Sequence, residues 1–395
     1  MLQGITIKNF RSAESVKVNL APLTIFYGPT SSGKSNLLYA FLVLRNFVLN
    51  PNRQADGFFH LGFMDLGGFE ACVFNHDTAR SVEISLEFKN GTQAASYGVA
   101  FSKASGNIVE RFGEFQMEAQ VNLPYGLNQT FPFVFGKGEE EYSVNWNGIT
   151  CSVAPKTPTA ENQQRAQEIA TLVNKPSEVL RAIDIAPHRR GFFKPNYTTT
   201  PVSPTPTNED EVASFIINDQ YLPGRISNYT EEIFGRDFRI HVPVGTATAF
   251  FHSTDKKSRI PVFLVNDGFG VNQVIYMLAK MLRIDVNTIL IEEPEVHLHP
   301  TVLRSFARAL CSFVKDEGKQ IVLTTHSEQF LAAILTAVAD DFLKPEDIRC
   351  HLTSKDKKAT SFEEQKVGKD GQIEGGLTSF VEAEIEDLRR FLSVK

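Results

Sequence analysis

Residues 23–36, LTIFYGPTSSGKSN, are the stretch that decides the fold of this chain. The apolar half, 23–27, is typical of a buried strand, and apolar residues at helical spacing follow the polar half. Between them, residues 28–35 have the spacing G-x-x-x-x-G-K-S. A strand, a glycine-rich loop and a helix in this order let backbone N–H groups wrap a phosphate at a helix N-terminus. We therefore expect an α/β protein that binds a nucleotide through a P-loop.

The residues of this loop have separate expected roles. Its two glycines allow the backbone to approach a phosphate closely. Lys34 would reach the β- and γ-phosphates of ATP and assist catalysis, and the Ser35 hydroxyl would ligate Mg²⁺. The alternative, a glycine turn with a surface lysine, fits the flanking strand and helix less well. The expected nucleotide-binding residues of the loop are Gly28, Pro29, Thr30, Ser31, Ser32, Gly33, Lys34, Ser35 and Asn36.

A second apolar strand pattern ends in acidic residues, in the stretch TILIEEPE over residues 288–295. Two adjacent carboxylates at the end of a strand can divide two tasks between them. We assign Glu292 to the Mg²⁺ shell and Glu293 to the general base that orients and deprotonates the attacking water. The alternative is a solvated acidic turn, which the nearby P-loop pattern disfavours.

A third apolar strand pattern, residues 321–325, is followed by His326 and Ser327. Ligands of open parallel sheets bind at the carboxyl ends of the strands. His326 would therefore contact the γ-phosphate or the attacking water, and together with Lys34 and Glu293 it completes the expected catalytic set. The alternative is that Ser327 only caps a following helix.

Composition sets limits on the class of protein. The chain has 395 residues and a net charge of -6, ordinary for a globular protein with two or three domains' worth of chain. The mild acidity argues against a surface built to coat nucleic acid. Four scattered cysteines without a C-x-x-C pair argue against a disulfide scaffold and fit a reducing cytoplasm. We expect no membrane segment, because no apolar run approaches about 18 residues.

Patterning outside the motifs predicts several kinds of structure. Alternation over 82–153 predicts antiparallel hairpins, and helical patterns cover 159–182 and 209–234. The Pro- and Thr-rich segment 194–208 between those helices is the best candidate for a linker or a mobile loop. Strands and helices alternate from about 247 onward, as in a parallel α/β sheet. No heptad array predicts a long coiled-coil arm. The hairpin turn signals are Asn90-Gly91, Ser105-Gly106 and Asn147-Gly148.

As a set, these motifs resemble the ABC-type ATPase heads of the OLD, RecF, Rad50 and SMC group, often called AAA15 or AAA21 ATPases. The resemblance implies a P-loop NTPase, α/β in class, with one composite head over 1–395. Within it we expect a β-rich N-terminal lobe over 1–155, a helical, Pro/Thr-rich insertion over 156–235, and a parallel α/β C-terminal lobe over 236–395. The matching stretches are ITIKNFRS, GPTSSGKSNLLYA, IEEPEVHLHP and TTHSEQFL.

The resemblance also implies nucleotide contacts outside the P-loop. Arg11, in the NFRS step, would touch phosphate or adenine. The stretch DGFGVNQ resembles a divergent signature, so Gly268, Gly270 and Gln273 would face the γ-phosphate bound by an opposite subunit. A glycine step that opens a helix suits an anion, because free N–H groups and the helix dipole point at it. The alternative for DGFGVNQ is a plain turn and helix cap.

For function, the resemblance implies a Mg²⁺-dependent ATPase that forms an ATP-dependent homodimer and works as a switch. It points to prokaryotic DNA maintenance or anti-phage defence, with a separately encoded effector such as a nuclease. The alternatives are a nucleotide-gated interaction scaffold with negligible turnover, and a repair ATPase that binds DNA. About 70 residues follow His326, and they contain no D-x-D, so we expect no fused Toprim nuclease.

Two lesser features remain open at this point. The basic step Pro187-His188-Arg189-Arg190 either senses phosphate or nucleic acid, or is a solvated turn. His297 and His299 alternate as zinc ligands can, but the sequence offers no third ligand nearby, which disfavours a metal role.

Overall fold

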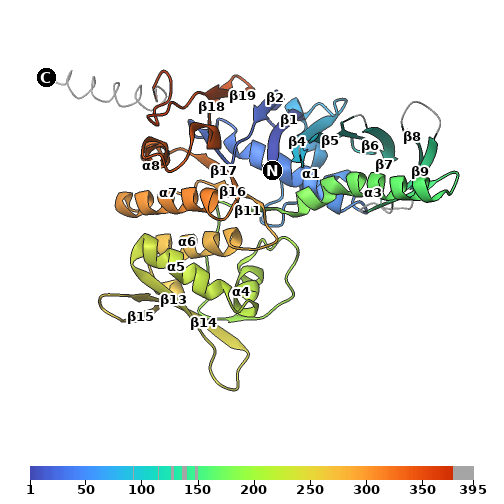
Figure 1. Ribbon diagram of the computed structural model, residues 1–395. Coiled ribbons are helices and arrows are strands. Elements are labelled where there is room, and N and C mark those ends of the chain that lie inside the picture. The colour runs from blue at the N-terminus through green and yellow to red at the C-terminus, as the bar shows by residue number, and fades with distance from the viewer. Residues whose placement is uncertain (92, 114, 126–128, 136–139, 147–149, 377–395) are drawn as a thin grey trace. The chain divides into compact units, whose positions relative to one another are not determined.

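The computed structural model describes residues 1–91, 93–113, 115–125, 129–135, 140–146 and 150–376 (Figure 1). The chain divides into two compact units, and each is described here by itself. Unit 1 comprises Met1–Leu20, Ser35–Ala182 and Lys355–Ser361. Unit 2 comprises Ala21–Lys34, Ile183–Ser354 and the described residues from Phe362 onward. Both are therefore assembled from segments that lie far apart in the sequence.

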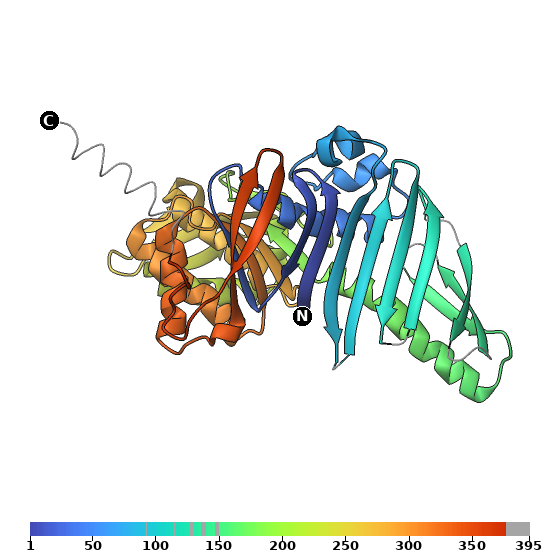
Figure 2. The same cartoon turned by 90° about the horizontal axis from the view of Figure 1, so that it is seen from above.

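Unit 1 is built on a six-stranded antiparallel sheet, seen in blue to teal in Figure 2, with strand order β2-β1-β4-β5-β6-β7. Alternate side chains of β5 point into the core, in the period of two that a half-buried strand requires. The strands are β1 (Leu2–Phe10), β2 (Ala13–Asn19), β4 (Val82–Asn90), β5 (Gln93–Phe101), β6 (Ser105–Phe112) and β7 (Phe115–Asn122).

The expected hairpin turns of unit 1 have different outcomes. Asn90 and Gly91 lie at the turn between β4 and β5, as predicted. The prediction of a turn at Ser105-Gly106 is wrong, because these two residues begin β6. Gly106 is there for packing instead: a Cβ atom on it would lie 3.2 Å from the ring of Phe47. The third expected turn, Asn147-Gly148, lies outside the described residues.

Helices complete unit 1. α1 (Lys34–Leu49) carries Phe47, whose ring lies 5.3 Å from that of Phe101 in β5. The Gly- and Phe-rich stretch 56–80 contains short helical turns, η1 (Ala55–Phe59), α2 (Gly68–Cys72) and η2 (Phe74–His76). A smaller sheet joins β8 (Gln129–Phe135), β9 (Glu140–Trp146) and β10 (Cys151–Pro155), and the long helix α3 (Ala160–Arg181) follows it.

Unit 2 contains the parallel sheet, with strand order β11-β16-β17-β3-β18-β19. Every residue of β3, β16 and β17 is buried, as expected of parallel strands covered on both faces. The strands are β3 (Leu23–Tyr27), β11 (Ile183–Ala186), β16 (Thr288–Glu292), β17 (Gln320–Thr325), β18 (Ile348–Asp356) and β19 (Ala359–Gln365). The neighbours β11, β16, β17, β3 and β18 run parallel to one another.

The helices of unit 2 lie in layers, with α7 nearest the sheet and α6 and α5 beyond it (Figure 1). α7 buries one face, which includes Leu303, Phe306 and Leu310 at helical spacing. Its other helices are α4 (Glu209–Asn218), α5 (Leu222–Phe234), α6 (Phe269–Met281), α7 (Pro300–Lys315) and α8 (Glu328–Ala339), and its short turns are η3 (Leu264–Asn266) and η4 (Pro345–Asp347).

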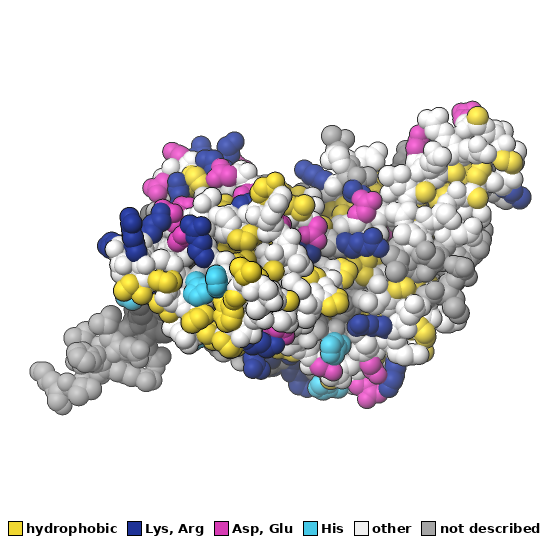
Figure 3. All heavy atoms as spheres, turned by 90° about the horizontal axis from the view of Figure 1, so that it is seen from below, with side chains coloured by type: hydrophobic (Ala, Val, Ile, Leu, Met, Phe, Trp, Pro, Cys, Tyr) yellow, Lys and Arg dark blue, Asp and Glu magenta, His cyan; other side chains and the backbone are white. Residues whose placement is uncertain are grey.

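A small antiparallel sheet belongs to unit 2 as well. It joins β12 (Tyr197–Thr198), β13 (Arg236–His241), β14 (Thr248–Asp255) and β15 (Pro261–Phe263). Figure 3 shows the molecule from below the view of Figure 1, which is the side on which this sheet lies. Hydrophobic, histidine and basic side chains are close together on that face.

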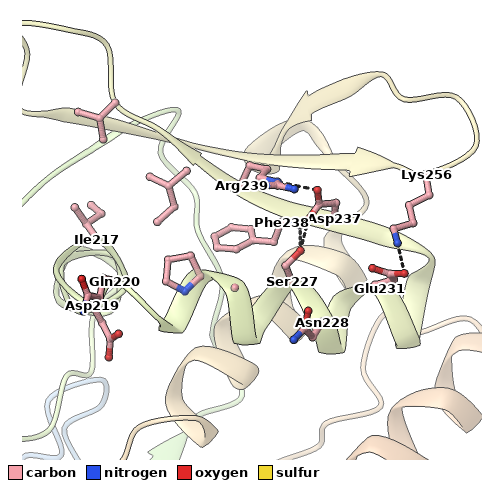
Figure 4. A pocket seen from close by; sticks show the side chains of 14 residues that line it. Ile217, Asp219, Gln220, Ser227, Asn228, Glu231, Asp237, Phe238, Arg239 and Lys256 are labelled. Carbon is pink, nitrogen blue, oxygen red and sulfur yellow. Dashed lines mark hydrogen bonds and ion pairs between the residues drawn. The ribbon is translucent and has the colours of Figure 1, made fainter.

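A groove of 630 Å³ lies between α5 and β13 (Figure 4). Ser227 of α5 bonds to Asp237 of β13, and Asp237 also pairs with Arg239 at 2.7 Å. At one end of the groove Lys256 pairs with Glu231. These charged side chains of the groove thus pair with one another, and none of the expected site residues lines the groove.

The prediction that segment 194–208 is a linker is wrong. Lys194 pairs with Asp210 of α4 at 2.5 Å, and the amide of Thr200 donates to the hydroxyl of Ser214 at 2.8 Å. The buried ammonium of Lys280 in α6 donates to the carbonyl of Pro206. Proline lacks an N–H but keeps its carbonyl, so a Pro-rich segment can still be anchored by donors from neighbouring helices.

The division into units also differs from the expected lobes. α3 belongs to unit 1, whereas α4 and α5 belong to unit 2. Residues 156–235 therefore do not form one separate insertion. The part of this region that belongs to unit 2 begins with β11, which is held by ion pairs to a buried carboxylate. Lys280 lies 3.0 Å from one carboxylate oxygen of Asp184 in β11, and Arg283 lies 3.2 Å from the other.

All four cysteines are free thiols. Cys72, Cys311 and Cys350 are buried and Cys151 is half-buried, and burial raises the pKa of each of them to about 12. None of the described helices is both long enough and apolar enough to span a bilayer.

Candidate active site

Three neighbouring strands of unit 2 bring the main expected residues to one edge of the sheet. β3, β17 and β16 are parallel neighbours, with Tyr27 beside Thr325 and Thr324 beside Glu292. The carboxyl ends of parallel strands lie at the same edge. The loop that follows β3 therefore emerges beside Glu293 and His326, which follow β16 and β17.

The loop needs glycine at its first position for two reasons. Gly28 has a φ of 142°, a conformation that residues with a Cβ atom rarely adopt. A Cβ atom there would also lie 2.3 Å from the carbonyl oxygen of Thr353 in β18. Ser31 and Gly33 have positive φ values as well, 65° and 102°. The strained backbone makes a tight curve, in which Pro29 and Thr30 are exposed and Ser32 is buried.

The ammonium group of Lys34 lies inside this curve. Its Nζ donates hydrogen bonds to the carbonyl oxygens of Gly28 at 2.9 Å and Pro29 at 2.8 Å. Burial lowers the pKa of Lys34, and the negative charges of Glu293 and Glu295 oppose that shift. The loop thus holds a cation at its centre, close to the acidic turn.

Glu292 ends β16 as a buried carboxylate. Its Oε2 atom accepts a hydrogen bond from the backbone N–H of His188 at 3.1 Å. This contact follows from the sheet order, since β11 is the parallel neighbour of β16.

Glu293 has a strained backbone, with a φ of 41°. Its N–H donates to the carbonyl of Thr324 at 2.9 Å, which fixes the turn against β17. Its carboxylate, 25% exposed, lies between two imidazoles: Oε1 is 3.3 Å from Nδ1 of His326, and Oε2 is 3.4 Å from Nδ1 of His188. The expected base and the expected histidine are therefore in contact, together with a second histidine.

Glu295 is a site residue that the sequence reasoning missed. Its Oε1 accepts hydrogen bonds from the Thr325 hydroxyl at 2.6 Å and from the His326 N–H at 3.0 Å. Burial raises the pKa of Glu295, and these hydrogen bonds oppose the shift. In the sequence Glu295 was visible as the third acidic residue of EEPE. In the structure its hydrogen bond holds the backbone of His326 in place.

Arg190 is the second site residue whose role could not be assigned from the sequence. Its guanidinium is buried and donates to the carbonyl oxygens of Pro187 at 2.9 Å, Glu292 at 2.5 Å and Glu293 at 2.8 Å. Burial lowers its pKa to about 10, and the nearby Glu295, Glu292 and Glu293 oppose that shift. Arg190 thus spans the end of β11 and the acidic turn.

The signature-like stretch begins α6. Gly268 is the exposed N-cap, and a Cβ atom on Gly270 would lie 2.7 Å from the carbonyl oxygen of His297. Close packing against that turn explains the second glycine. Gln273 is 3% exposed, so its side chain lies inside the protein rather than beside the exposed Gly268. The neighbouring Asn272 bonds to both backbone groups of Phe192.

The remaining expected residues belong to unit 1. Ser35 and Asn36 are half-buried, and the Asn36 amide donates to the Ser12 hydroxyl at 2.7 Å. Arg11 is exposed with a φ of 52°, and its guanidinium lies 5.9 Å from the centre of the Tyr39 ring. Asn36 and Arg11 thus contact different residues of unit 1, Ser12 and Tyr39.

The histidines of HLHP have structural partners. The His299 ring caps α7, accepting from the N–H of Thr301, and the His297 ring lies edge-on to Phe269 at 4.8 Å. In the part of the chain that the structure describes, no three His, Cys, Asp or Glu residues are grouped so as to hold a metal ion on their own.

The geometry fits a nucleoside triphosphate with Mg²⁺. Gly28 keeps the loop backbone free of side-chain bulk, and carbonyl oxygens of the loop hold the Lys34 ammonium where phosphate oxygens could replace them. The carboxylates of Glu292 and Glu293 lie at the same sheet edge, and hard divalent cations prefer such oxygen ligands. Fold and site together define an α/β P-loop NTPase of the ABC type.

Comparison of sequences places the chain further. The model of the AAA ATPase domain family (AAA_15) matches residues 1–185 and 192–331. The chain therefore belongs to this family.

Curated relatives are similar over most of the chain. The Old nuclease of Escherichia phage P2 is 20% identical over 359 residues, 84% of this chain and 57% of the relative. The OLD nuclease of Thermus scotoductus is 22% identical over 351 residues, 84% of this chain and 60% of the relative. Endonuclease GajA of Bacillus cereus is 34% identical over 83 residues, 21% of this chain and 12% of the relative. The chain thus spans little more than half the length of the two OLD relatives.

Solved structures give weaker likenesses. The SMC head domain from Thermotoga maritima has a TM-score of 0.44 and 12% identity, covering 91% of this chain and 97% of that one. An Smc head domain from Pyrococcus furiosus, bound to the C-terminal domain of ScpA, has a TM-score of 0.46 and 9% identity, covering 98% and 99%.

Proposed function

We propose that this chain hydrolyses ATP in the presence of Mg²⁺ and uses the reaction to switch between conformations. The observation that carries the proposal is the contact of Glu293 with His326 at the sheet edge that also bears the P-loop. A general base needs a neighbouring group that orients it, and His326 is positioned to do so for Glu293.

Each residue would have a defined task in this reaction. Lys34 would exchange its two loop carbonyls for β- and γ-phosphate oxygens. Ser35 and Glu292 would hold Mg²⁺, which neutralises charge on the phosphates. Glu293 would accept the proton of the attacking water, and His326 would orient that water or the γ-phosphate. Glu295 holds the backbone of His326 through the hydrogen bond already described.

We further propose an ATP-dependent homodimer. The N-terminus of α6 is exposed at Gly268, and a helix N-terminus attracts an anion, which suits the γ-phosphate of an opposite subunit. Gly270 would be needed to bring that N-terminus against the turn at His297. The side chain of Gln273 is buried, so in this proposal it packs inside the protein and does not contact the nucleotide. Arg11 remains part of the proposal as an exposed cation for the nucleotide.

The cellular role is proposed from the relatives. The curated relatives are nucleases by name, which favours a DNA-linked role in maintenance or anti-phage defence. An effector such as a separately encoded nuclease would be the partner that the switch controls. A cytoplasmic location fits four cysteines that are all free.

The replacement Glu293→Gln tests hydrolysis. It keeps the shape of the side chain and removes its basicity, so we expect turnover to fall at least 100-fold while nucleotide binding persists. With Mg²⁺ and ATP, the variant should accumulate as a dimer in sedimentation or light scattering. Lys34→Ala should instead lose nucleotide binding. A Glu293→Gln chain that turns over ATP and remains monomeric like the wild type would refute the assignment.

DNA binding is the second candidate function, favoured by the nuclease relatives. Binding through phosphate contacts would weaken steeply as salt rises, with a slope that counts the phosphates neutralised. Titration of duplex DNA with and without ATP, at several salt concentrations, measures this. Affinity that does not respond to salt would exclude direct recognition of the DNA backbone.

A further inference from the structure

The four residues that follow β11, Pro187 to Arg190, lie against the acidic turn. We propose that His188 is a positioning residue for Glu293, presented by a backbone that Arg190 locks in place. This inference rests on the proposed function, since it concerns the base of the same reaction. It assigns a role to a basic step that the sequence left open.

Arg190 fixes the two backbones relative to each other. Its guanidinium bonds to Pro187 on one side and to Glu292 and Glu293 on the other, all through carbonyl oxygens. A planar guanidinium presents several donors in a rigid fork, so one side chain can hold three acceptors in fixed geometry. The turn at Glu293 is strained, and strain of this kind persists only where surrounding contacts enforce it.

The segment is anchored at its far end too. Asn272 of α6 accepts from the N–H of Phe192 at 2.7 Å and donates to its carbonyl at 2.8 Å. Gly191 has a φ of 131°, and a Cβ atom on it would lie 3.1 Å from the Asn272 side chain. The chain from Pro187 to Phe192 is therefore held between the acidic turn and α6.

His188 makes two contacts from this fixed position. Its backbone N–H donates to Oε2 of Glu292, and its ring Nδ1 lies 3.4 Å from Oε2 of Glu293. The other carboxylate oxygen of Glu293 faces His326. A carboxylate held at both oxygens cannot rotate freely, which keeps one lone pair aimed at a water molecule. His188 would thus act on the chemical step rather than on nucleotide binding.

The exposure of His188 makes it a clean target for substitution. Its side chain is 54% exposed, so its removal should leave the fold intact. Arg189 supplies the matched control, because it is exposed, adjacent, and makes no hydrogen bond or ion pair that the structure describes for it.

The kinetic test compares three variants in steady-state ATP hydrolysis. We expect His188→Ala to lower kcat about tenfold with KM changed less than twofold. His188→Gln, whose amide can donate to Glu293, should recover to within about threefold of the wild type. Arg189→Ala should match the wild type. An unchanged kcat in His188→Ala, an equal loss in both His188 variants, or a loss confined to KM would each overturn the proposal.

A second test does not depend on turnover. In histidine-labelled protein, the NMR signal of the His188 ring, identified by its absence in His188→Gln, should move when Glu293→Gln is introduced. The exposed substitution Glu346→Gln should leave it in place. A His188 signal that ignores Glu293→Gln would overturn the contact. An inactive wild-type chain whose His188 signal does respond would refute hydrolysis while supporting the contact.

Discussion

At the scale of single residues, two glycines with positive φ values are required for different reasons. Gly28 combines a backbone conformation closed to other residues with a close approach to the backbone of Thr353. Gly235, which ends α5, has a φ of 68° but open space around its missing Cβ. At Gly235 a side chain would cost only the free energy of an unfavourable backbone conformation. At Gly28 it would in addition collide with the backbone of Thr353.

Replacing each of these glycines by alanine should show the difference. Gly235→Ala should lower the free energy of unfolding by about 1 kcal/mol, the usual cost of a left-handed residue with a Cβ atom. Gly28→Ala should lower it by clearly more and should abolish nucleotide binding, because the new Cβ collides with a carbonyl oxygen. Urea unfolding and nucleotide titration measure both. Equal losses would mean that Thr353 gives way at little cost.

Glu110 is a residue whose stability effect should depend on pH. It lies on the inward face of β6 opposite Tyr97, and burial raises its pKa well above the usual value. The folded chain therefore keeps a proton that the unfolded chain loses above about pH 4.3. Protonated Glu110 is tolerated in the core, so its contribution to the free energy of unfolding is highest at low pH. That contribution falls as the pH rises towards the pKa of Glu110 in the folded chain.

We expect Glu110→Gln to remove this loss. The variant should melt at a higher temperature than the wild type at pH 8, and the gap should close as pH falls towards 4. Thermal unfolding across that range measures it. A gap that stays constant with pH would show that Glu110 is ionised in the folded chain.

The sequence predicted local motifs whose residues lie close together in the structure, and it missed contacts across the sheet. The P-loop, Glu293 and His326 were visible because strand, turn and chemistry are contiguous in each motif. The contacts of Arg190 and His188 arise because β11 lies beside β16, about 100 residues away in the chain. Strand order in a sheet is a non-local property, so spacing in the sequence carries no sign of it.

At the scale of elements, the composition of segment 194–208 led to a wrong prediction. A high content of Pro and Thr indicates a lack of regular secondary structure, but it does not show whether neighbouring helices offer hydrogen-bond partners. The helix that follows, α4, begins at a cap that the sequence does show: the Asn208 side chain accepts from the N–H of Glu211 at 2.9 Å. The anchored segment thus leads directly into a well-capped helix.

Two asparagine substitutions should have opposite effects. Asn208→Ala removes the cap and should lower the free energy of unfolding by about 1 kcal/mol. Asn228→Ala, at an exposed position within α5, should raise it by roughly 0.5 kcal/mol, since alanine is the better helix former. Chemical denaturation of both variants decides it. An Asn208→Ala variant that is as stable as the wild type would show that the cap of α4 has no role in stability.

At the scale of the whole molecule, the sequence predicted the parallel α/β part and did not predict how the chain is shared out. Hairpins and alternating helices were recognisable from their periods. The chain passes from one unit to the other between residues 20 and 21, 34 and 35, 182 and 183, 354 and 355, and 361 and 362. Such divisions follow from packing between distant segments, which local patterns do not encode.

Nucleotide should stabilise the whole molecule if the proposed function holds. At a free concentration 100 times its dissociation constant, a ligand of the folded state adds about 2.7 kcal/mol. We expect ATP with Mg²⁺ to raise the melting temperature of Glu293→Gln, and EDTA to reduce that rise. Lys34→Ala should show no rise. A melting temperature that nucleotide leaves unchanged would argue against a nucleotide site.

The burial of three thiols and the partial burial of the fourth make the chain convenient for spectroscopy. A thiol with a pKa near 12 is almost entirely protonated at neutral pH, and a protonated thiol reacts poorly with maleimides. Folded protein should therefore take up little reagent, whereas protein in guanidinium should take up four equivalents, as mass spectrometry would show. A fluorophore on a single introduced surface cysteine would then report on this molecule without removal of its native ones.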